Sequence, residues 1–76
     1  MSEQTFGEEA VELSFNPSGD PLVEEIKRGF AVVIDALQRE RLQQRSGEKA
    51  RMYSVAITEA QTAQMWAVKA ATWKGN

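Results

Sequence analysis

The stretch from Arg51 to Trp73 (RMYSVAITEAQTAQMWAVKAATW) contains no glycine and no proline. Alanines recur along it at spacings of three and four residues, at positions 56, 60, 63, 67 and 70. This is the period of a helix face that presses against another helix. Alanine is the strongest helix former, and its short side chain does not hold a neighbouring helix away. The stretch therefore predicts a long helix that packs closely on a second one.

A second helix is predicted from Pro21 to Gln44, because apolar side chains recur there at spacings of four, four, three and four: Leu22, Ile26, Phe30, Val33 and Leu37. The preceding residues FNPSGDP are typical of a turn. Asp20 is suited to cap the helix, with Pro21 in its first position, where the missing N–H costs nothing.

The triplet Arg45–Ser46–Gly47 separates the two helices, and we expect Ser46 to cap the second one, from Glu48 to Trp73. Two helices of similar length joined by a short loop fold back on each other. The sequence thus predicts an all-α antiparallel hairpin domain over residues 15–76, preceded by an N-terminal segment of residues 1–14. In that segment, residues 1–7 look uncapped, and Glu8–Leu13 is expected to form one or two helical turns that dock on the hairpin.

Length and composition limit what such a hairpin can do. A chain of 76 residues buries little apolar surface, and this one has no cysteine and no histidine. Disulfide scaffolds, zinc sites of the usual kind and histidine-based catalytic triads are therefore excluded. Self-association remains as the means of stabilisation, because one hairpin seam cannot hold all the large apolar side chains, and a symmetric homo-oligomer is expected.

Charge and hydropathy argue against two further classes of partner. The net charge of −2 argues against binding to long nucleic acids, although residues 39–51 hold five bases and two acids, enough to serve a small anionic ligand. No apolar run approaches the length needed to cross a membrane, and no basic-then-apolar signal peptide is present.

Four motifs resemble the hairpin domain of phage anti-CBASS sponges, which is shared with anti-Thoeris sponges: FNPSGDP, EEIK, R-x-x-S-x-A-I-T and MWAVKAATW. The resemblance covers about Phe15 to Trp73. It implies a helical, non-catalytic protein without cofactor or metal that assembles as a hexamer. It also implies pockets between protomers that sequester cyclic dinucleotides, and in some members cyclic trinucleotides near threefold axes. The expected location is the cytoplasm of the infected bacterial host.

A cyclic nucleotide needs cations or N–H donors for its phosphates and flat surfaces for its bases. The resemblance implies that Phe15 stacks on a base and that Asn16 bonds a base edge, although the pair could equally form a hydrophobic plug and a turn cap. Ser18 and Gly19 could offer backbone N–H groups to a phosphate, or only form the turn. Lys27, within the EEIK match, is a candidate phosphate ligand or a solvated lysine.

The second predicted helix carries a further polar set. Arg51, Ser54 and Thr58 share one side of it, and repetition around a threefold axis would present three guanidinium groups and six hydroxyls to a cyclic trinucleotide. An ordinary solvated face is the alternative. Lys69 is a candidate phosphate contact, and Trp66 and Trp73 either stack on bases or pack in an interface.

Two other functions remain open. The first is a helical adaptor that binds a host or phage protein through an apolar face. The second, an enzyme, is disfavoured because the sequence shows no pair of acid and base groups on one face. Asp20 stands where the resemblance leads us to expect asparagine, and an acid close to an anion pocket weakens phosphate binding.

Overall fold

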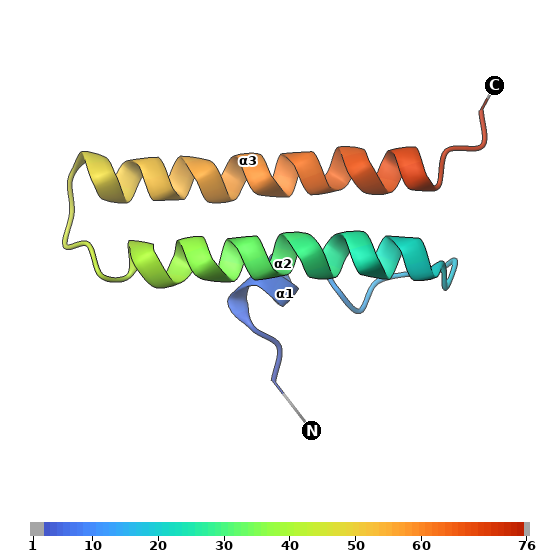
Figure 1. Ribbon diagram of the computed structural model, residues 1–76, viewed down its shortest axis with the longest axis horizontal. Coiled ribbons are helices and arrows are strands. Elements are labelled where there is room, and N and C mark those ends of the chain that lie inside the picture. The colour runs from blue at the N-terminus through green and yellow to red at the C-terminus, as the bar shows by residue number, and fades with distance from the viewer. Residues whose placement is uncertain (1–2, 76) are drawn as a thin grey trace.

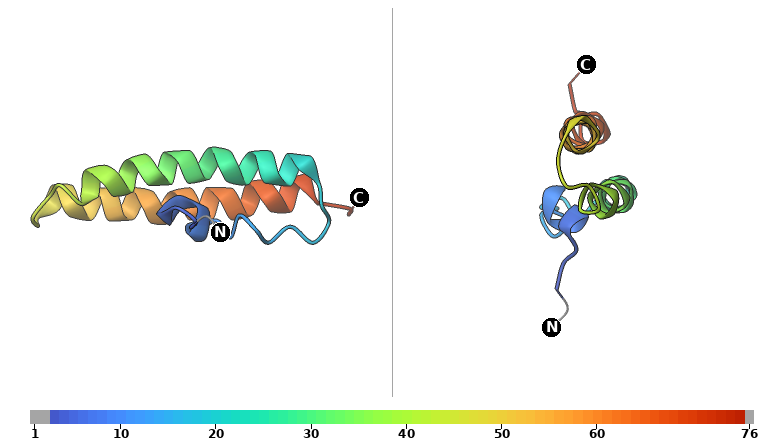
Figure 2. Two further views of the ribbon diagram at one scale, coloured as in Figure 1. Left: turned by 90° about the horizontal axis from the view of Figure 1, so that it is seen from below. Right: turned by 90° about the vertical axis from the view of Figure 1, so that its left-hand side faces the viewer.

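The computed structural model describes residues 3–75 and confirms an all-α hairpin (Figure 1). Three helices follow in order: α1 (Phe6–Ala10), α2 (Pro21–Arg41) and α3 (Glu48–Ala71). Helices α2 and α3 run side by side in opposite directions, and α1 lies against α2 (Figures 1 and 2). No helix within residues 3–75 is long and apolar enough to cross a membrane.

The helix boundaries follow local capping chemistry. Helix α2 begins where predicted, since Asp20 Oδ1 accepts the Leu22 N–H at 2.9 Å and Pro21 occupies the first turn. The predicted ends were too long, because α2 ends at Arg41 and α3 at Ala71. Ser46 does not cap α3: Gly47, with a φ of 96°, is the N-cap residue and no side chain bonds the first turn.

The N-terminal segment is more ordered than the sequence suggested. Thr5 and Glu8 form a reciprocal capping box, so that α1 begins at Phe6 and the expectation of an uncapped start is wrong for the described residues 3–7. Residues 1 and 2 lie outside the described part of the chain. Helix α1 ends before Glu12, whose φ of 52° turns the chain back towards α2.

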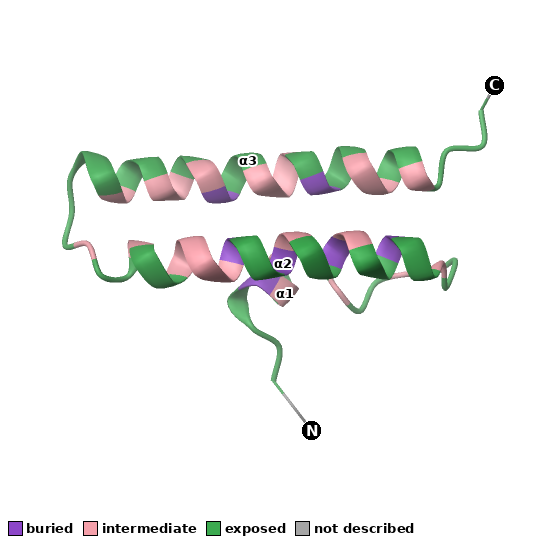
Figure 3. Ribbon diagram, in the orientation of Figure 1, coloured by how far each residue is buried: buried purple, intermediate pink, exposed green. Residues whose placement is uncertain are grey.

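Close contact between α1 and α2 is made at Gly7. Its N–H donates to Asp35 Oδ1 at 2.7 Å, and a Cβ at this position would lie 2.2 Å from the Ala31 carbonyl oxygen. This approach brings Val11 into one core with Ala31, Ile34 and Ile57. The N-terminal segment therefore contributes to the same core as the hairpin, as the buried faces in Figure 3 show.

A single chain leaves much apolar surface uncovered. The molecule measures 45 × 35 × 13 Å, so it is only about one helix thick in its shortest direction. Several large apolar side chains on α2, on α3 and just beyond α3 are exposed, including Val32, Val33, Met65, Trp66 and Trp73. The hairpin seam cannot accommodate them, which is the mismatch that the sequence indicated.

Candidate functional site

The candidate residues near the start of α2 gather in one place. Phe15, Asn16, Ser18 and Lys27 line a single open depression of about 370 Å³, which Val68, Thr72 and Lys74 close from the side of α3 and its C-terminal extension. The antiparallel hairpin brings the start of α2 next to the end of α3 (Figure 1). Residues distant in sequence thus form one surface with two ammonium groups and an aromatic ring.

The loop before α2 is held by its own side chains. Asn16 Nδ2 donates to the Asp20 carbonyl oxygen at 3.0 Å, and Asn16 Oδ1 accepts the Ser18 hydroxyl at 3.2 Å. Gly19, with a φ of 66°, donates its N–H to the Asn16 carbonyl oxygen. Asn16, Ser18 and Gly19 therefore all make hydrogen bonds within the turn. This is the structural role that the sequence analysis gave as the alternative to ligand binding.

Lys27 is buried, with 4% of its surface exposed, whereas the sequence analysis expected a phosphate ligand or a solvated lysine. Its ammonium donates to the carbonyl oxygens of Glu12 and Phe15, so it ties the end of the N-terminal segment to the loop. Phe15 is 63% exposed, and its ring centroid lies 5.6 Å from Lys27 Nζ. The Phe15 ring thus contacts a cation within the chain and keeps most of its surface available for stacking on a flat partner.

Lys69 of α3 lies between two exposed indoles, Trp66 of the same helix and Trp73 just beyond its end. Its Nζ is 5.2 Å from the ring centroid of Trp66 and 5.8 Å from that of Trp73, and the three side chains with Ala70 line a depression of about 420 Å³. Lys69 also lines a neighbouring depression with Phe15 and Lys27. The arrangement offers a cation and two flat apolar surfaces next to the loop.

Arg51, Ser54 and Thr58 form a separate group near the α2–α3 turn. Eighteen residues of helix separate Arg51 from Lys69, which at a rise of 1.5 Å per residue is about 27 Å. Ser54 Oγ accepts a hydrogen bond at 3.1 Å from Arg41 Nη1, while Thr58 is exposed. The structure therefore does not bring the two candidate groups together within one chain.

Arg41 is a member of this second group that the sequence analysis did not single out. Besides Ser54, it bonds Gln38, and its guanidinium carbon lies 5.7 Å from the ring centroid of Phe6. It thereby links α1, α2 and α3. The signal available in the sequence was their place at the same end of the predicted hairpin, because Arg41 lies at the end of α2 and Ser54 in the second turn of α3.

The exposed guanidinium of Arg51 is paired with Glu48 one turn earlier. Arg51 Nε donates to Glu48 Oε1 at 3.0 Å, and Nη2 donates to the other carboxylate oxygen. These bonds lower the pKa of Glu48 below its ordinary value and raise the pKa of Arg51. A phosphate approaching Arg51 would compete with a carboxylate that is already in place.

No group of three or more potential metal ligands occurs among the residues that the structure describes. The candidate surfaces therefore offer ammonium and guanidinium groups, hydroxyls, an amide and aromatic rings. This chemistry suits recognition of an anion that carries flat rings.

Comparison of the sequence with known proteins found a match to one protein family. The model of "Acb2/Tad1, hairpin domain" matches residues 8–72. No curated protein and no solved structure matched the chain. The match begins before Phe15, at residue 8, and ends at residue 72, so it includes Val11, Lys69 and the group of Arg51, Ser54 and Thr58 but stops before Trp73. The chain belongs to the Acb2/Tad1 hairpin family, the phage anti-CBASS and anti-Thoeris sponges.

Proposed function

We propose that this protein sequesters cyclic di- or trinucleotide second messengers without cleaving them, and so withdraws the signal of CBASS-type immunity in the cytoplasm of an infected bacterial host. The family match over residues 8–72 carries this proposal, because sequestration is the activity that membership suggests. The candidate surfaces support it, since each combines cations with groups that suit a base or a ribose.

The first surface is proposed to bind a cyclic dinucleotide. The exposed ring of Phe15 stacks on a base, and Lys69 supplies a charge for a phosphate, with Trp66 and Trp73 beside it as further stacking surfaces. Asn16, Ser18 and Gly19 shape the loop that carries Phe15. Lys27 adds positive potential below the ring.

The second surface is proposed to bind a cyclic trinucleotide in a symmetric assembly. A homo-oligomer, specifically a hexamer, repeats Arg51, Ser54 and Thr58 around a threefold axis, and Arg41 adds a cation beside each serine. Three repeated guanidinium groups match a ring of three phosphates in number and in charge. The dinucleotide surface is shallow and open in one chain, which is consistent with a second protomer completing it.

Calorimetry against a panel of cyclic di- and trinucleotides tests the proposal, with native mass spectrometry for stoichiometry and chromatography of the recovered ligand for its integrity. Phe15→Leu is expected to weaken dinucleotide binding and spare trinucleotide binding, and Arg51→Gln to do the reverse. Each variant is the control for the other. Absence of binding across the whole panel would reject sequestration, and conversion of the ligand would reject a non-enzymatic role.

The adaptor alternative draws support from the exposed apolar side chains, among them Val32, Met65, Trp66 and Trp73. It predicts a stable complex with a host or phage protein and no response to any nucleotide. The same calorimetric panel therefore separates the two functions.

A further inference from the structure

Gln64 is a buried polar residue in the third quarter of α3. It is 6% exposed, and it shares the buried side of the helix with Ile57, seven residues earlier, which belongs to the apolar core. Burial of an amide costs free energy unless hydrogen bonds replace those that it makes to water. An apolar side chain would therefore stabilise the single chain better at this position, which points to a role for Gln64 other than packing.

Within residues 3–75 the amide of Gln64 makes no hydrogen bond, in contrast to Gln61 one turn earlier, whose Nε2 donates to the Ala10 carbonyl oxygen at 3.4 Å. Every fully buried side-chain nitrogen or oxygen of the described residues has a partner. The unbonded amide of Gln64 therefore keeps a little exposure. The surface depression that Gln64 lines supplies it.

This depression, of about 320 Å³, lies between α3 and the segment that follows α1. Pockets for small molecules usually measure about 300–1,000 Å³, so its size suits part of a cyclic dinucleotide, such as one base. Two of its polar side chains are buried, and several other lining residues are exposed. The buried pair is Lys27 and Gln64, and the exposed residues include Glu12, Phe15, Met65 and Lys69.

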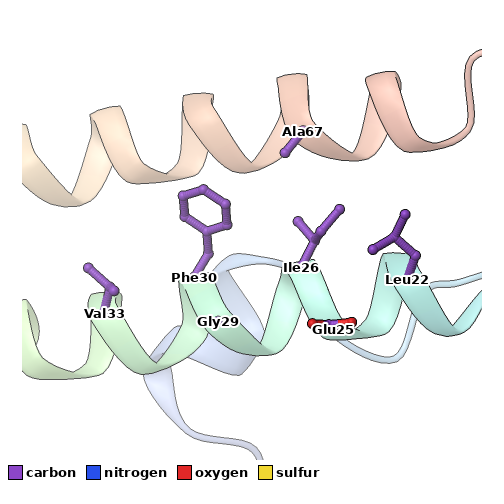
Figure 4. A pocket seen from close by; sticks show the side chains of 7 residues that line it. All are labelled: Leu22, Glu25, Ile26, Gly29, Phe30, Val33 and Ala67. Carbon is purple, nitrogen blue, oxygen red and sulfur yellow. The ribbon is translucent and has the colours of Figure 1, made fainter.

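The groove in Figure 4 has a different chemistry. Leu22, Ile26 and Phe30 rise there from α2 towards α3, and Glu25 supplies the one charged group among the lining residues. No side chain of that lining offers an N–H donor. The depression at Gln64 is the better place for a base, because bases are recognised by hydrogen bonds to their edges as well as by stacking.

The chemistry of an amide selects among the bases. Glutamine has an acceptor oxygen beside a donor nitrogen, so it can form two hydrogen bonds with an edge that presents a donor beside an acceptor. Adenine presents its 6-amino group beside a ring nitrogen and is the usual partner of glutamine. The paired acceptors of guanine suit lysine instead, but Lys27 already donates to two carbonyl oxygens.

We propose that Gln64 determines base specificity in this depression, by forming two hydrogen bonds to the edge of an adenine that stacks on Phe15. The inference rests on the proposed function and names the base that its first surface selects. Phosphate contacts from Lys27 and Lys69 position a ligand without distinguishing its bases, so the selectivity comes from Gln64. A ligand that leaves a buried amide unpaired is rejected.

Calorimetry with two ligands tests this role: cyclic di-AMP, and its analogue in which purine, without the 6-amino group, replaces both adenines. The wild-type chain is expected to bind the analogue about tenfold more weakly or worse, because the Gln64 oxygen loses its donor. Gln64→Met keeps the length of the side chain and is expected to weaken binding of cyclic di-AMP to a similar degree. The two ligands should then bind this variant equally, since both lack the same contact.

Gln61→Met is the matched control, because it makes the same change one turn earlier, outside the lining of the depression. It is expected to keep the wild-type affinity for both ligands. Urea unfolding separates binding from packing. Because the Gln64 amide makes no hydrogen bond within the described chain, Gln64→Met is expected to unfold at the same urea concentration as the wild type or at a higher one.

Equal affinity of the wild-type chain for the two ligands would overturn the inference without any variant. An unchanged affinity of Gln64→Met for cyclic di-AMP, an equal loss in Gln61→Met, or a Gln64→Met chain less stable than the wild type would also overturn it. A wild-type chain that does not bind cyclic di-AMP would do the same. Binding of another cyclic nucleotide of the panel would then leave the proposed function standing, whereas no binding at all would reject both.

Discussion

The docking of α1 on α2 predicts a specific effect of the substitution Gly7→Ala. Alanine is normally the better helix residue, so propensity alone predicts stabilisation by up to about 1 kcal/mol. Here a Cβ would lie 2.2 Å from the Ala31 carbonyl oxygen and 2.9 Å from its carbonyl carbon. Both are backbone atoms in the middle of α2, so α1 has to move away.

The cost follows from what that movement breaks. The bond from the Gly7 N–H to the carboxylate of Asp35 is worth about 1.5–3 kcal/mol, as for other hydrogen bonds to charged groups. Val11 is 2% exposed, and burial of a valine side chain is worth about 1.5–3 kcal/mol. Partial loss of both, less the gain in helix propensity, gives a decrease of about 3 kcal/mol in the free energy of unfolding.

Urea unfolding followed by far-ultraviolet circular dichroism, at one fixed protein concentration, measures this change. For a domain of this size, 3 kcal/mol corresponds to a fall in Tm of roughly 12–24 °C. Glu9→Ala places the same residue on the exposed side of α1 and is expected to change stability by less than about 0.5 kcal/mol. If Gly7→Ala proved as stable as Glu9→Ala, the docked position of α1 would be wrong.

Three further outcomes follow from other contacts. Lys27→Met keeps the buried stem but leaves two carbonyl oxygens without their donor, so a loss of about 2–4 kcal/mol of stability in urea unfolding is expected. An NMR titration of Glu48 is expected to have its midpoint below the ordinary value of 4.5, because Arg51 stabilises the ionised carboxylate. The ion pair is therefore lost as the pH falls through this lowered pKa. Arg51→Gln should raise the midpoint back towards the ordinary value. Asp20→Ala removes the bond to the Leu22 N–H and should cost about 1 kcal/mol in thermal melts, and an unchanged Tm would contradict the capping role.

Local sequence signals predicted the hairpin well, because its determinants are local. The apolar period of α2, the lack of glycine and proline in α3 and the Asp20–Pro21 start each act within a few residues of chain. The buried faces were predicted less well. In α3 the buried residues are Ile57 and Gln64 rather than the alanines, and in α2 they are Val23, Lys27, Ala31 and Ile34 rather than the stripe from Leu22 to Leu37. The start of α1 was missed although its signal was present: Thr5 and Glu8 have the spacing of a capping box. Helix ends were less predictable, since fraying of the last turn depends on packing as well as on sequence.

The candidate site was less predictable because its contacts join distant segments. The sequence does not show that Lys27 faces inward, since a lysine on an amphipathic helix is normally solvated. Its burial depends on the carbonyl oxygen of Glu12, a residue with a left-handed φ, which accepts a hydrogen bond from Lys27 Nζ. The roles of Gly7 and Arg41 likewise follow only when α1 is seen to lie across the hairpin.

Lys27 illustrates how a structural role and the proposed binding role are compatible in so small a chain. A buried ammonium is costly unless hydrogen bonds compensate for the lost water. Lysine has three N–H donors, and the carbonyl oxygens of Glu12 and Phe15 take two of them. The third is the donor that the proposed phosphate contact would use in the depression lined by Phe15 and Lys27. A phosphate there would meet a donor fixed in place by the fold, so little side-chain entropy would be lost on binding.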